Sequence, residues 1–195
     1  PNTNSVQGGT NAAGTLTRWY RDNLFFDALE LEKAGGPDAY ETMMKGLEDI
    51  PVGSDGLITL PYIAGERTPI NDPKAKGMIF GLSMQHTRAH IYHSALESIG
   101  YSIANHLAIF RENGAAPKRI FAAGGGTKNP IWMQIIADIT GEEIHTANVT
   151  IGAAYGDALM AAIATGHISK FADIRNYITE GVSYKPNAEN HEKYQ

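Results

Sequence analysis

The segment from Ile120 to Gly141 holds the residues whose types and order could do chemistry. A short apolar strand leads into Gly124, Gly125 and Gly126, and a helix follows them directly. Glycines let a ligand approach the backbone closely, and the unpaired N–H groups at a helix N-terminus attract anions. The segment therefore favours a nucleotide or phosphate site, with a purely structural turn as the alternative.

The helix after the glycines has clear boundaries. Asn129 is a good N-cap, Pro130 suits the first helical position, and Gly141 is a typical stop. One apolar stripe follows the helical period, formed by Ile131, Trp132, Ile135, Ile136 and Ile139. A Rossmann dinucleotide site is excluded, because the glycines lack the G-x-G-x-x-G spacing and no acidic residue follows a second strand at the usual distance.

The composition describes a single soluble domain. A chain of 195 residues with 43% hydrophobic content can bury one substantial core. The formal charge of −5 argues against nucleic acid, which demands clustered Lys and Arg. The chain has no cysteine, and no apolar stretch is long enough to span a bilayer or to act as a signal segment. We expect a cytoplasmic protein that is not attached to a membrane.

Hydrophobic periodicity and turn residues predict the order of elements. The expected strands cover residues 5–9, 57–63, 77–82, 118–123 and 143–147. The expected helices cover residues 11–22, 38–48, 87–112, 130–140, 152–165 and 171–179, before a polar tail over 186–195. Alanines and glycines dominate the helix over 152–165, so it could pack very close to a neighbouring element. Strands that alternate with long helices in the second half predict an α/β layered domain.

Several motifs together resemble the C-terminal domain of the FGGY carbohydrate kinases. The segment 77–82, then His90-Ile91, then 94–97 matches the signature of that family. The preceding segment 60–77 is similar to a loop of the family's xylulose kinases, and the glycine run is similar to its adenosine motif. The resemblance covers nearly the whole chain, because Gly152-Ala153-Ala154 and Tyr184-Lys185-Pro186 also fit the end of the family pattern.

The resemblance implies an actin-like, ribonuclease H-like ATPase domain, with a mixed sheet and helices on both faces. Residues 1–195 would be the C-terminal nucleotide-binding domain of a two-domain sugar kinase. Such a kinase transfers the γ-phosphate of ATP to a sugar hydroxyl with Mg²⁺ on the phosphates, and D-xylulose is the expected sugar. Kinases of ribulose, gluconate and glycerol share the same plan and stay as alternatives, as does a non-enzymatic actin-like nucleotide-binding module. The oligomeric state stays open, and a homodimer is one alternative.

The same resemblance assigns binding residues and no catalytic ones. It places the phosphate loops and the general-base aspartate in the first domain and at the very start of the second, outside this chain, so this chain alone is expected to be inactive. Gly125 matches the position where the backbone meets the nucleotide, between Gly124 and Gly126. Asn129 matches a position whose side chain reaches the adenine, although it could equally serve only as a helix cap. Gly14 matches a glycine that lines the nucleotide pocket.

Other polar residues have competing interpretations. Arg18 lies one turn after Gly14 and could contact a phosphate or simply face solvent. His86, His90 and His93 are spaced so that they could bind zinc, but a structural role is favoured for them and no metal site is assigned.

The acidic residues outside the glycine segment receive no catalytic role. Glu66 and Arg67 could reach substrate or the other domain, or form an exposed ion pair. Glu97 is expected to orient packing or to cap a backbone group. None of three further carboxylates is assigned to Mg²⁺, namely Asp72, Asp138 and Asp157.

Overall fold

A computed structural model describes residues 5–149 and 151–195 of the chain. Its α-helices are α1 (Ala13–Asn23), α2 (Phe26–Lys33), α3 (Ala39–Met44), α4 (Arg88–Glu112), α5 (Pro130–Thr140), α6 (Ala153–Ala164) and α7 (Ala188–Tyr194). The strands are β1 (Ile58–Leu60), β2 (Met78–Phe80), β3 (Ile120–Ala122), β4 (Ile144–Ala147) and β5 (Glu180–Tyr184). Short 3₁₀ helices are η1 (Leu47–Asp49), η2 (Ser54–Gly56), η3 (Gly125–Lys128) and η4 (Phe171–Asn176).

The strands form two separate sheets. In the larger sheet β4 is central, since it pairs parallel with β3 and antiparallel with β5. The other sheet is a ribbon of two antiparallel strands, β1 and β2. The expected α/β architecture with a mixed sheet is confirmed.

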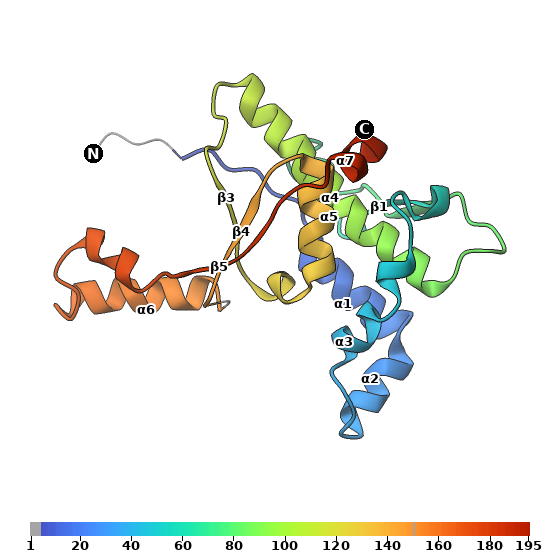
Figure 1. Cartoon of the computed structure of the whole chain (residues 1–195), viewed down its shortest axis with the longest axis horizontal. Helices are drawn as coiled ribbons and strands as arrows, with labels where there is room; N and C mark the ends of the chain where they lie inside the picture. The colour runs from blue at the N-terminus through green and yellow to red at the C-terminus, as the bar shows by residue number, and fades with distance from the viewer. Residues whose placement is uncertain (1–4, 150) are drawn as a thin grey trace.

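The elements follow one another along the long axis of the molecule. Figure 1 shows the larger sheet, then α5, then the long helix α4, then the ribbon that contains β1. A Cβ on Gly100 of α4 would lie 2.6 Å from Cδ1 of Ile139 on α5, so the missing side chain is what allows the two helices to approach closely. Buried residues of α4 and α5 form the centre of the core, joined by the buried face of α1.

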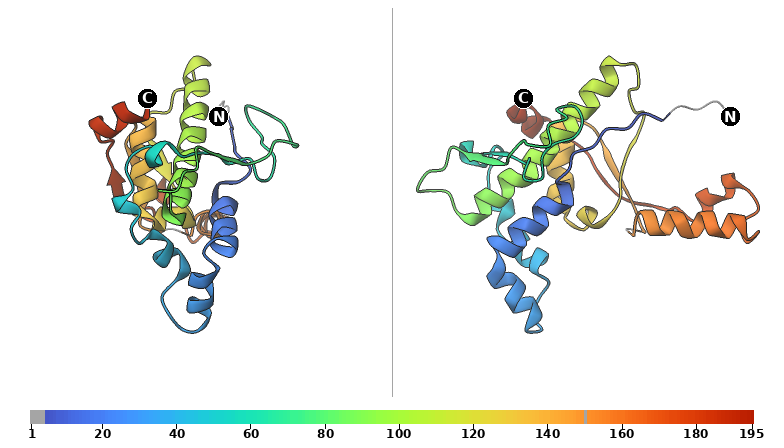
Figure 2. Two further views of the ribbon diagram at one scale, coloured as in Figure 1. Left: turned by 90° about the vertical axis from the view of Figure 1, so that its right-hand side faces the viewer. Right: turned by 180° about the vertical axis from the view of Figure 1, so that it is seen from behind.

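Helix α6 buries little of its surface against the rest of the molecule. Figures 1 and 2 show it extending away from the body of the molecule, at the end opposite to the β1–β2 ribbon. Leu159 is its only buried residue, and most of its alanines and glycines are exposed. The close packing expected for these small residues is therefore not made within the described part of the chain. No helix in that part is long and apolar enough to span a bilayer.

Several expected boundaries were wrong for local reasons. Residues 5–9 run extended but form no strand, because no described strand pairs with them. The expected helix over 38–48 ends at Met44, since Lys45 is extended and Gly46 after it is left-handed with φ 77°. The expected helix over 171–179 is the 3₁₀ helix η4. Two elements were missed, α2 and β5. Helix α2 buries only Ala28, so it lacks the periodic apolar stripe by which helices are found.

The expected polar tail over 186–195 is a docked helix, α7. Asn187 caps it by accepting a hydrogen bond from the N–H of Asn190. The buried carboxylate of Asp138 on α5 accepts hydrogen bonds from the N–H of Asn187 at 2.8 Å and from Nδ2 of Asn190 at 2.9 Å. Tyr194 is buried at the end of this helix. The terminal segment is thus part of the folded domain, because a carboxylate from another helix satisfies its first polar groups.

We predict that Asp138→Ala destabilises the protein by about 1–3 kcal/mol, because it leaves buried donors without an acceptor. The free energy of unfolding, measured by urea denaturation, checks this. Asp157→Ala on α6 is the matched control and should change stability by less than about 0.5 kcal/mol, since Asp157 is exposed. Equal stability of the two variants would show that Asp138 does not hold α7.

Candidate nucleotide-binding site

The glycine turn joins β3 to α5. Its first residue has a backbone conformation that only glycine adopts freely. Gly124 has φ 98° and ψ −176°, a region that is essentially closed to residues with a side chain. Its carbonyl oxygen accepts hydrogen bonds from the N–H of Thr127 at 3.1 Å and from Oγ1 of Thr127 at 2.8 Å. Gly124 is therefore required by the turn itself, whether or not a ligand is present.

Gly126 is required by packing. A Cβ at this position would lie 2.9 Å from Cζ3 of Trp132, whose ring is buried. The indole cannot move aside easily, because it belongs to the core cluster. The structural alternative for the glycine run thus accounts for two of its three members.

Gly125 has no such structural reason to be glycine. Its φ lies outside the left-handed region, and a Cβ added to it would meet no atom within 4 Å. The same is true of Gly14, in the first turn of α1. Figures 1 and 2 show the beginning of α1 near η3 on the same side of the molecule. The backbone at Gly125 therefore faces space that the described residues leave open to a ligand.

Asn129 acts as a helix cap in this structure. Its Oδ1 accepts a hydrogen bond from the N–H of Trp132 at 3.0 Å, and the residue is largely buried. Its Nδ2 donates to no residue of the described chain, so it is free to donate to a ligand. The two roles expected for Asn129 use different atoms and are compatible.

A hollow of about 220 Å³ opens between the glycine turn and α3. It is lined by Asp38, Tyr40, Glu41, Met44, Gly125, Lys128 and Asn129. The contribution of α3 was missed by the sequence analysis, because these residues lie far from the glycines along the chain. Their only local signal is the capping residue Asp38, whose carboxylate accepts from the N–H groups of Tyr40 and Glu41.

The charges around the hollow favour a neutral group over an anionic one. Asp38 and Glu41 supply two carboxylates on the α3 side, and Lys128 supplies one cation. A phosphate beside α3 would be repelled, whereas a heterocycle with amino groups could donate to these carboxylates. Arg18, one turn after Gly14, is exposed and makes no hydrogen bond or ion pair within the described residues.

His86, just before α4, and His90 and His93 in its first turns all face one loop and do not converge on a common point. Nε2 of His90 lies 3.2 Å from the Asp55 carboxylate, and Nε2 of His86 lies 3.3 Å from the Asp55 carbonyl oxygen. Nδ1 of His93 lies 2.8 Å from Oγ of Ser54. Ser54 and Asp55 both have positive φ, so these contacts hold a strained turn against α4. In the chain outside the masked positions, no group of three or more His, Asp and Glu side chains is placed to hold a metal.

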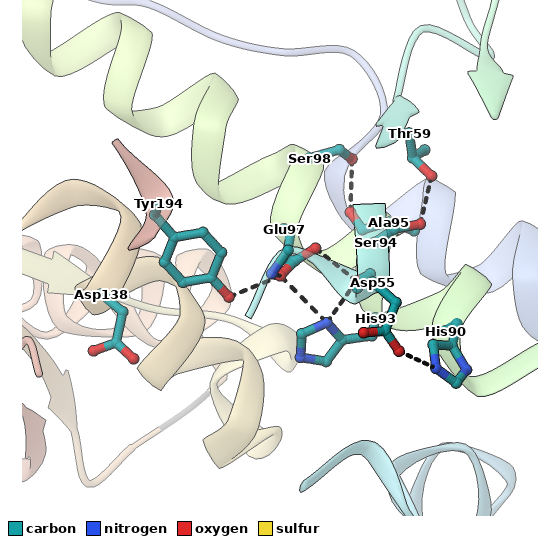
Figure 3. A network of polar contacts seen from close by, with 12 residues as sticks. Asp55, Thr59, His90, His93, Ser94, Ala95, Glu97, Ser98, Asp138 and Tyr194 are labelled. Carbon is teal, nitrogen blue, oxygen red and sulfur yellow. Dashed lines mark hydrogen bonds and ion pairs between the residues drawn. The ribbon is translucent and has the colours of Figure 1, made fainter. Parts of the chain in front are cut away.

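Glu97 lies at the centre of a buried polar network (Figure 3). Its carboxylate accepts from the N–H of Gly53 at 2.8 Å, from Oγ of Ser54 at 2.7 Å and from the hydroxyl of Tyr194 at 2.8 Å. Burial, with the charge of Glu97, raises the pKa of Tyr194 above its ordinary value. The network joins α4 to the 53–56 turn and to α7. The expectation that Glu97 caps a backbone group is confirmed.

Glu66 is buried, so the exposed ion pair with Arg67, one of the two alternatives for these residues, is not formed. Its carboxylate accepts from the hydroxyl of Thr10 at 2.7 Å and from the N–H groups of Asn11 and Arg67 at 3.2 and 2.7 Å. These bonds tie the segment before α1 to the 65–76 loop. Of the other carboxylates, Asp72 caps the N–H of Lys74, and Asp138 holds α7.

Comparison with known proteins places this chain in a family. The model of the FGGY family of carbohydrate kinases, C-terminal domain, matches residues 2–165. The chain therefore belongs to the FGGY carbohydrate kinases, as a C-terminal domain. It is 31% identical over 190 residues to the xylulose kinase of Bacillus subtilis, covering 97% of this chain and 36% of that protein. It is 32% identical over 190 residues to the gluconokinase of Bacillus licheniformis, covering 97% of this chain and 37% of that protein.

Solved structures confirm the actin-like fold. The crystal structure of xylulose kinase from Rhodospirillum rubrum matches with a TM-score of 0.78 and 31% identity, over 95% of this chain and 36% of that one. The glycerol kinase of Plasmodium falciparum, solved with ADP, matches with a TM-score of 0.73 at 19% identity, over 95% of this chain and 35% of that one. The chain thus spans a little over a third of the length of the relatives that it matches.

The geometry predicts different stability effects for the three neighbouring glycines. Gly124→Ala and Gly126→Val should each destabilise the fold by about 1–3 kcal/mol, the first through backbone strain and the second through overlap with Trp132. Gly125→Ala should change stability by less than about 0.5 kcal/mol, because its side chain enters open space. Thermal melts of the three variants check this. A large loss for Gly125→Ala would mean that this glycine also serves the fold.

Proposed function

We propose that this chain is the ATP-binding part of a sugar kinase and forms one wall of its catalytic cleft. The observation that supports it most is Gly125, a glycine that the fold does not require, beside a hollow of about 220 Å³. Close approach to a ligand is the remaining physical reason for a glycine there. The membership of the chain in a kinase family supports the same assignment.

In this proposal the adenine occupies the hollow between α3 and the glycine turn. Nδ2 of Asn129 donates to a ring nitrogen, and the carboxylates of Asp38 and Glu41 accept from the exocyclic amino group, directly or through water. The phosphates then lie away from α3, beyond Gly125 and toward the open backbone of Gly14. Arg18 is free to contact them because it is exposed and has no partner among the described residues.

The residues of this chain suit a binding role more than a chemical one. Catalysis of phosphoryl transfer depends on positioning the γ-phosphate and neutralising its charge. In our proposal the Mg²⁺ arrives on the phosphates of ATP, since the described carboxylates form no metal-binding group. The general base and the sugar site belong to an N-terminal domain of the complete protein, which closes on this one in the cytoplasm and excludes water from the cleft.

The sugar is proposed to be D-xylulose. The 60–77 loop is the part of the sequence that resembles xylulose kinases, and xylulose kinases are frequent among the relatives. Gluconokinases are as similar to the chain, so gluconate is the main alternative. A non-enzymatic actin-like module is the other alternative, and it would bind ATP without turnover on any sugar.

We predict that Gly125→Val lowers ATP affinity at least tenfold with little change in the melting temperature, because the added side chain fills the ligand's place. Asn129→Ala should lower both the stability and the ATP affinity. The lost N-cap should cost about 1 kcal/mol of stability, and the lost hydrogen bond to the base a similar amount of binding free energy. Calorimetric titration with ATP and thermal melts measure the two effects. GTP in place of ATP tests the contacts to the base. The guanine carbonyl would face the carboxylates of Asp38 and Glu41, so GTP should bind more weakly than ATP.

The histidines provide the matched control for the nucleotide site. Double replacement of His86 and His90 by Ala should leave ATP affinity and metal content unchanged, since both rings contact the Asp55 turn. Unchanged affinity in Gly125→Val would contradict the site, and loss of a bound metal in the histidine variant would contradict the assignment of those residues.

We predict no turnover by this chain alone, because it supplies one wall of the cleft. A coupled assay of ADP release with D-xylulose and ATP checks this, and turnover well above the no-enzyme control would contradict it. The complete protein should show its highest kcat/KM for D-xylulose among xylulose, ribulose, gluconate and glycerol. A preference for gluconate would show that the 60–77 loop does not report the substrate.

A further inference from the structure

A second hollow, with a volume of about 340 Å³, lies between α4, strand β1 and the 61–70 segment. It shares no lining residue with the hollow at the glycine turn. Figure 2 shows the loop that follows β1 beside α4, at the end of the molecule opposite to α6. The walls of this second hollow are largely apolar or aromatic, with side chains from Ile58, Leu60, Tyr62, Pro69, Ile70 and Tyr101. The proposed nucleotide therefore makes no use of it.

Glu66 supplies the one carboxylate in the wall of this hollow. Among the described residues that form the wall, there is no lysine or arginine. Glu66 is only 5% exposed, and no described side chain forms an ion pair with it. The neighbouring Arg67 does not provide the missing charge, because its guanidinium lies beside Gly9. Burial removes the water that stabilises a carboxylate, so a positive group would be favourable here.

The carboxylate of Glu66 has room for one more hydrogen-bond donor. Its Oε1 accepts from the N–H groups of Asn11 and Arg67, whereas its Oε2 accepts only from the hydroxyl of Thr10. Each oxygen of an ionised carboxylate can accept about two hydrogen bonds, so one position on Oε2 is unused. The three existing bonds also fix the direction of the carboxylate, so the group is in place before a ligand arrives.

The other polar groups of the wall do not neutralise this charge. His106 donates through Nδ1 to the carbonyl oxygen of Ser102 at 2.6 Å, and its Nε2 is buried, so neither ring nitrogen is available to Glu66. Burial raises the pKa of the Tyr62 hydroxyl, and the nearby charge of Glu66 raises it further. Aromatic rings such as that of Tyr62 attract cations. The hollow therefore favours a positive group and disfavours a negative one.

We infer that this hollow binds a small organic cation, namely a primary amine with an apolar body. The ammonium group donates to Oε2 of Glu66, and the apolar body packs against the walls that Ile58, Leu60 and Ile70 provide. A volume of about 340 Å³ suits such a molecule, since small-molecule sites span about 300–1,000 Å³. A neutral ligand would leave the charge of Glu66 unpaired. The inference does not rest on the proposed nucleotide site, because the two hollows share no residue.

Three probes of similar shape and different charge test this inference. They are phenethylamine, the neutral phenethyl alcohol and the anionic phenylacetate. In calorimetric titrations at neutral pH, the amine should bind this chain about tenfold tighter than the alcohol, and phenylacetate should not bind. The complete protein that contains the chain should give the same order. Equal affinities for the amine and the alcohol would identify a merely apolar cavity and overturn the inference, as would the absence of amine binding.

Two substitutions locate the amine. Glu66→Gln keeps the shape of the side chain and removes its charge, and the hydroxyl of Thr10 can accept a hydrogen bond as well as donate one. This variant should weaken phenethylamine about tenfold and leave phenethyl alcohol unchanged. Asn105→Lys should also weaken the amine, because it places a cation in the wall without touching the bonds of Glu66.

Asn113→Lys is the matched control, since Asn113 lies at the end of the same helix and outside the wall. It should bind phenethylamine like the wild type. Thermal melts should show both lysine variants folded, because Asn105 and Asn113 are exposed. An amine affinity that is unchanged in Asn105→Lys and in Glu66→Gln would overturn the inference. ATP titration of the same samples keeps the two proposals distinguishable, since failure to bind ATP would not alter amine binding.

Discussion

The close contact between α4 and α5 is the constraint on which the rest of the structure depends. It requires Gly100, because any side chain there would overlap Ile139. Once the two helices are in contact, the N-terminus of α5 and the glycine turn before it have a defined position relative to the core. The histidines and Glu97 of α4 then anchor the 53–56 turn, and Glu97 together with Asp138 of α5 holds α7. One helix pair thus positions both the candidate site and the C-terminal segment.

The three glycines of the candidate site show how one motif can combine different physical requirements. Gly124 is needed for its backbone conformation, and Gly126 is needed because Trp132 occupies the adjacent space. Gly125 is needed for neither reason, since its φ is not left-handed and a Cβ there would enter open space. In our proposal the contact with the ligand therefore belongs to the middle glycine, and its neighbours maintain the conformation of the turn. Asn129 caps α5 with its side-chain oxygen, and its side-chain nitrogen has no partner among the described residues.

The two ends of the domain differ in the side chains that they expose. The α6 end carries exposed alanines and borders the glycine turn, which suits a domain that closes over a nucleotide. The ribbon end exposes the large apolar side chains of Ile58, Met78 and Phe80, beside a loop that carries the exposed charges of Lys74 and Lys76.

The sequence by itself determined the class of fold, the helix α5 with its cap and stop, and the location of the glycine turn. These follow from local chemistry: periodic apolar residues, Asn129 before Pro130, and Gly141. The sequence also identified the family through short motifs, and the match to the family model confirmed that assignment. The helix α7 and the strand β5 were not foreseen, because their stability comes from Asp138 and β4, which lie far away along the chain.

Tertiary structure decided the roles of individual residues. It buried Glu66 against Thr10 and Asn11, and it brought α3 to the glycine turn. It also placed His90 against Asp55 and His93 against Ser54. It also decided which face of the β1–β2 ribbon is exposed, since alternation alone does not say which side meets α4. Local sequence specifies backbone conformation through short-range sterics and hydrogen bonds. The partner of a side chain depends on packing between distant segments, and only the folded chain determines it.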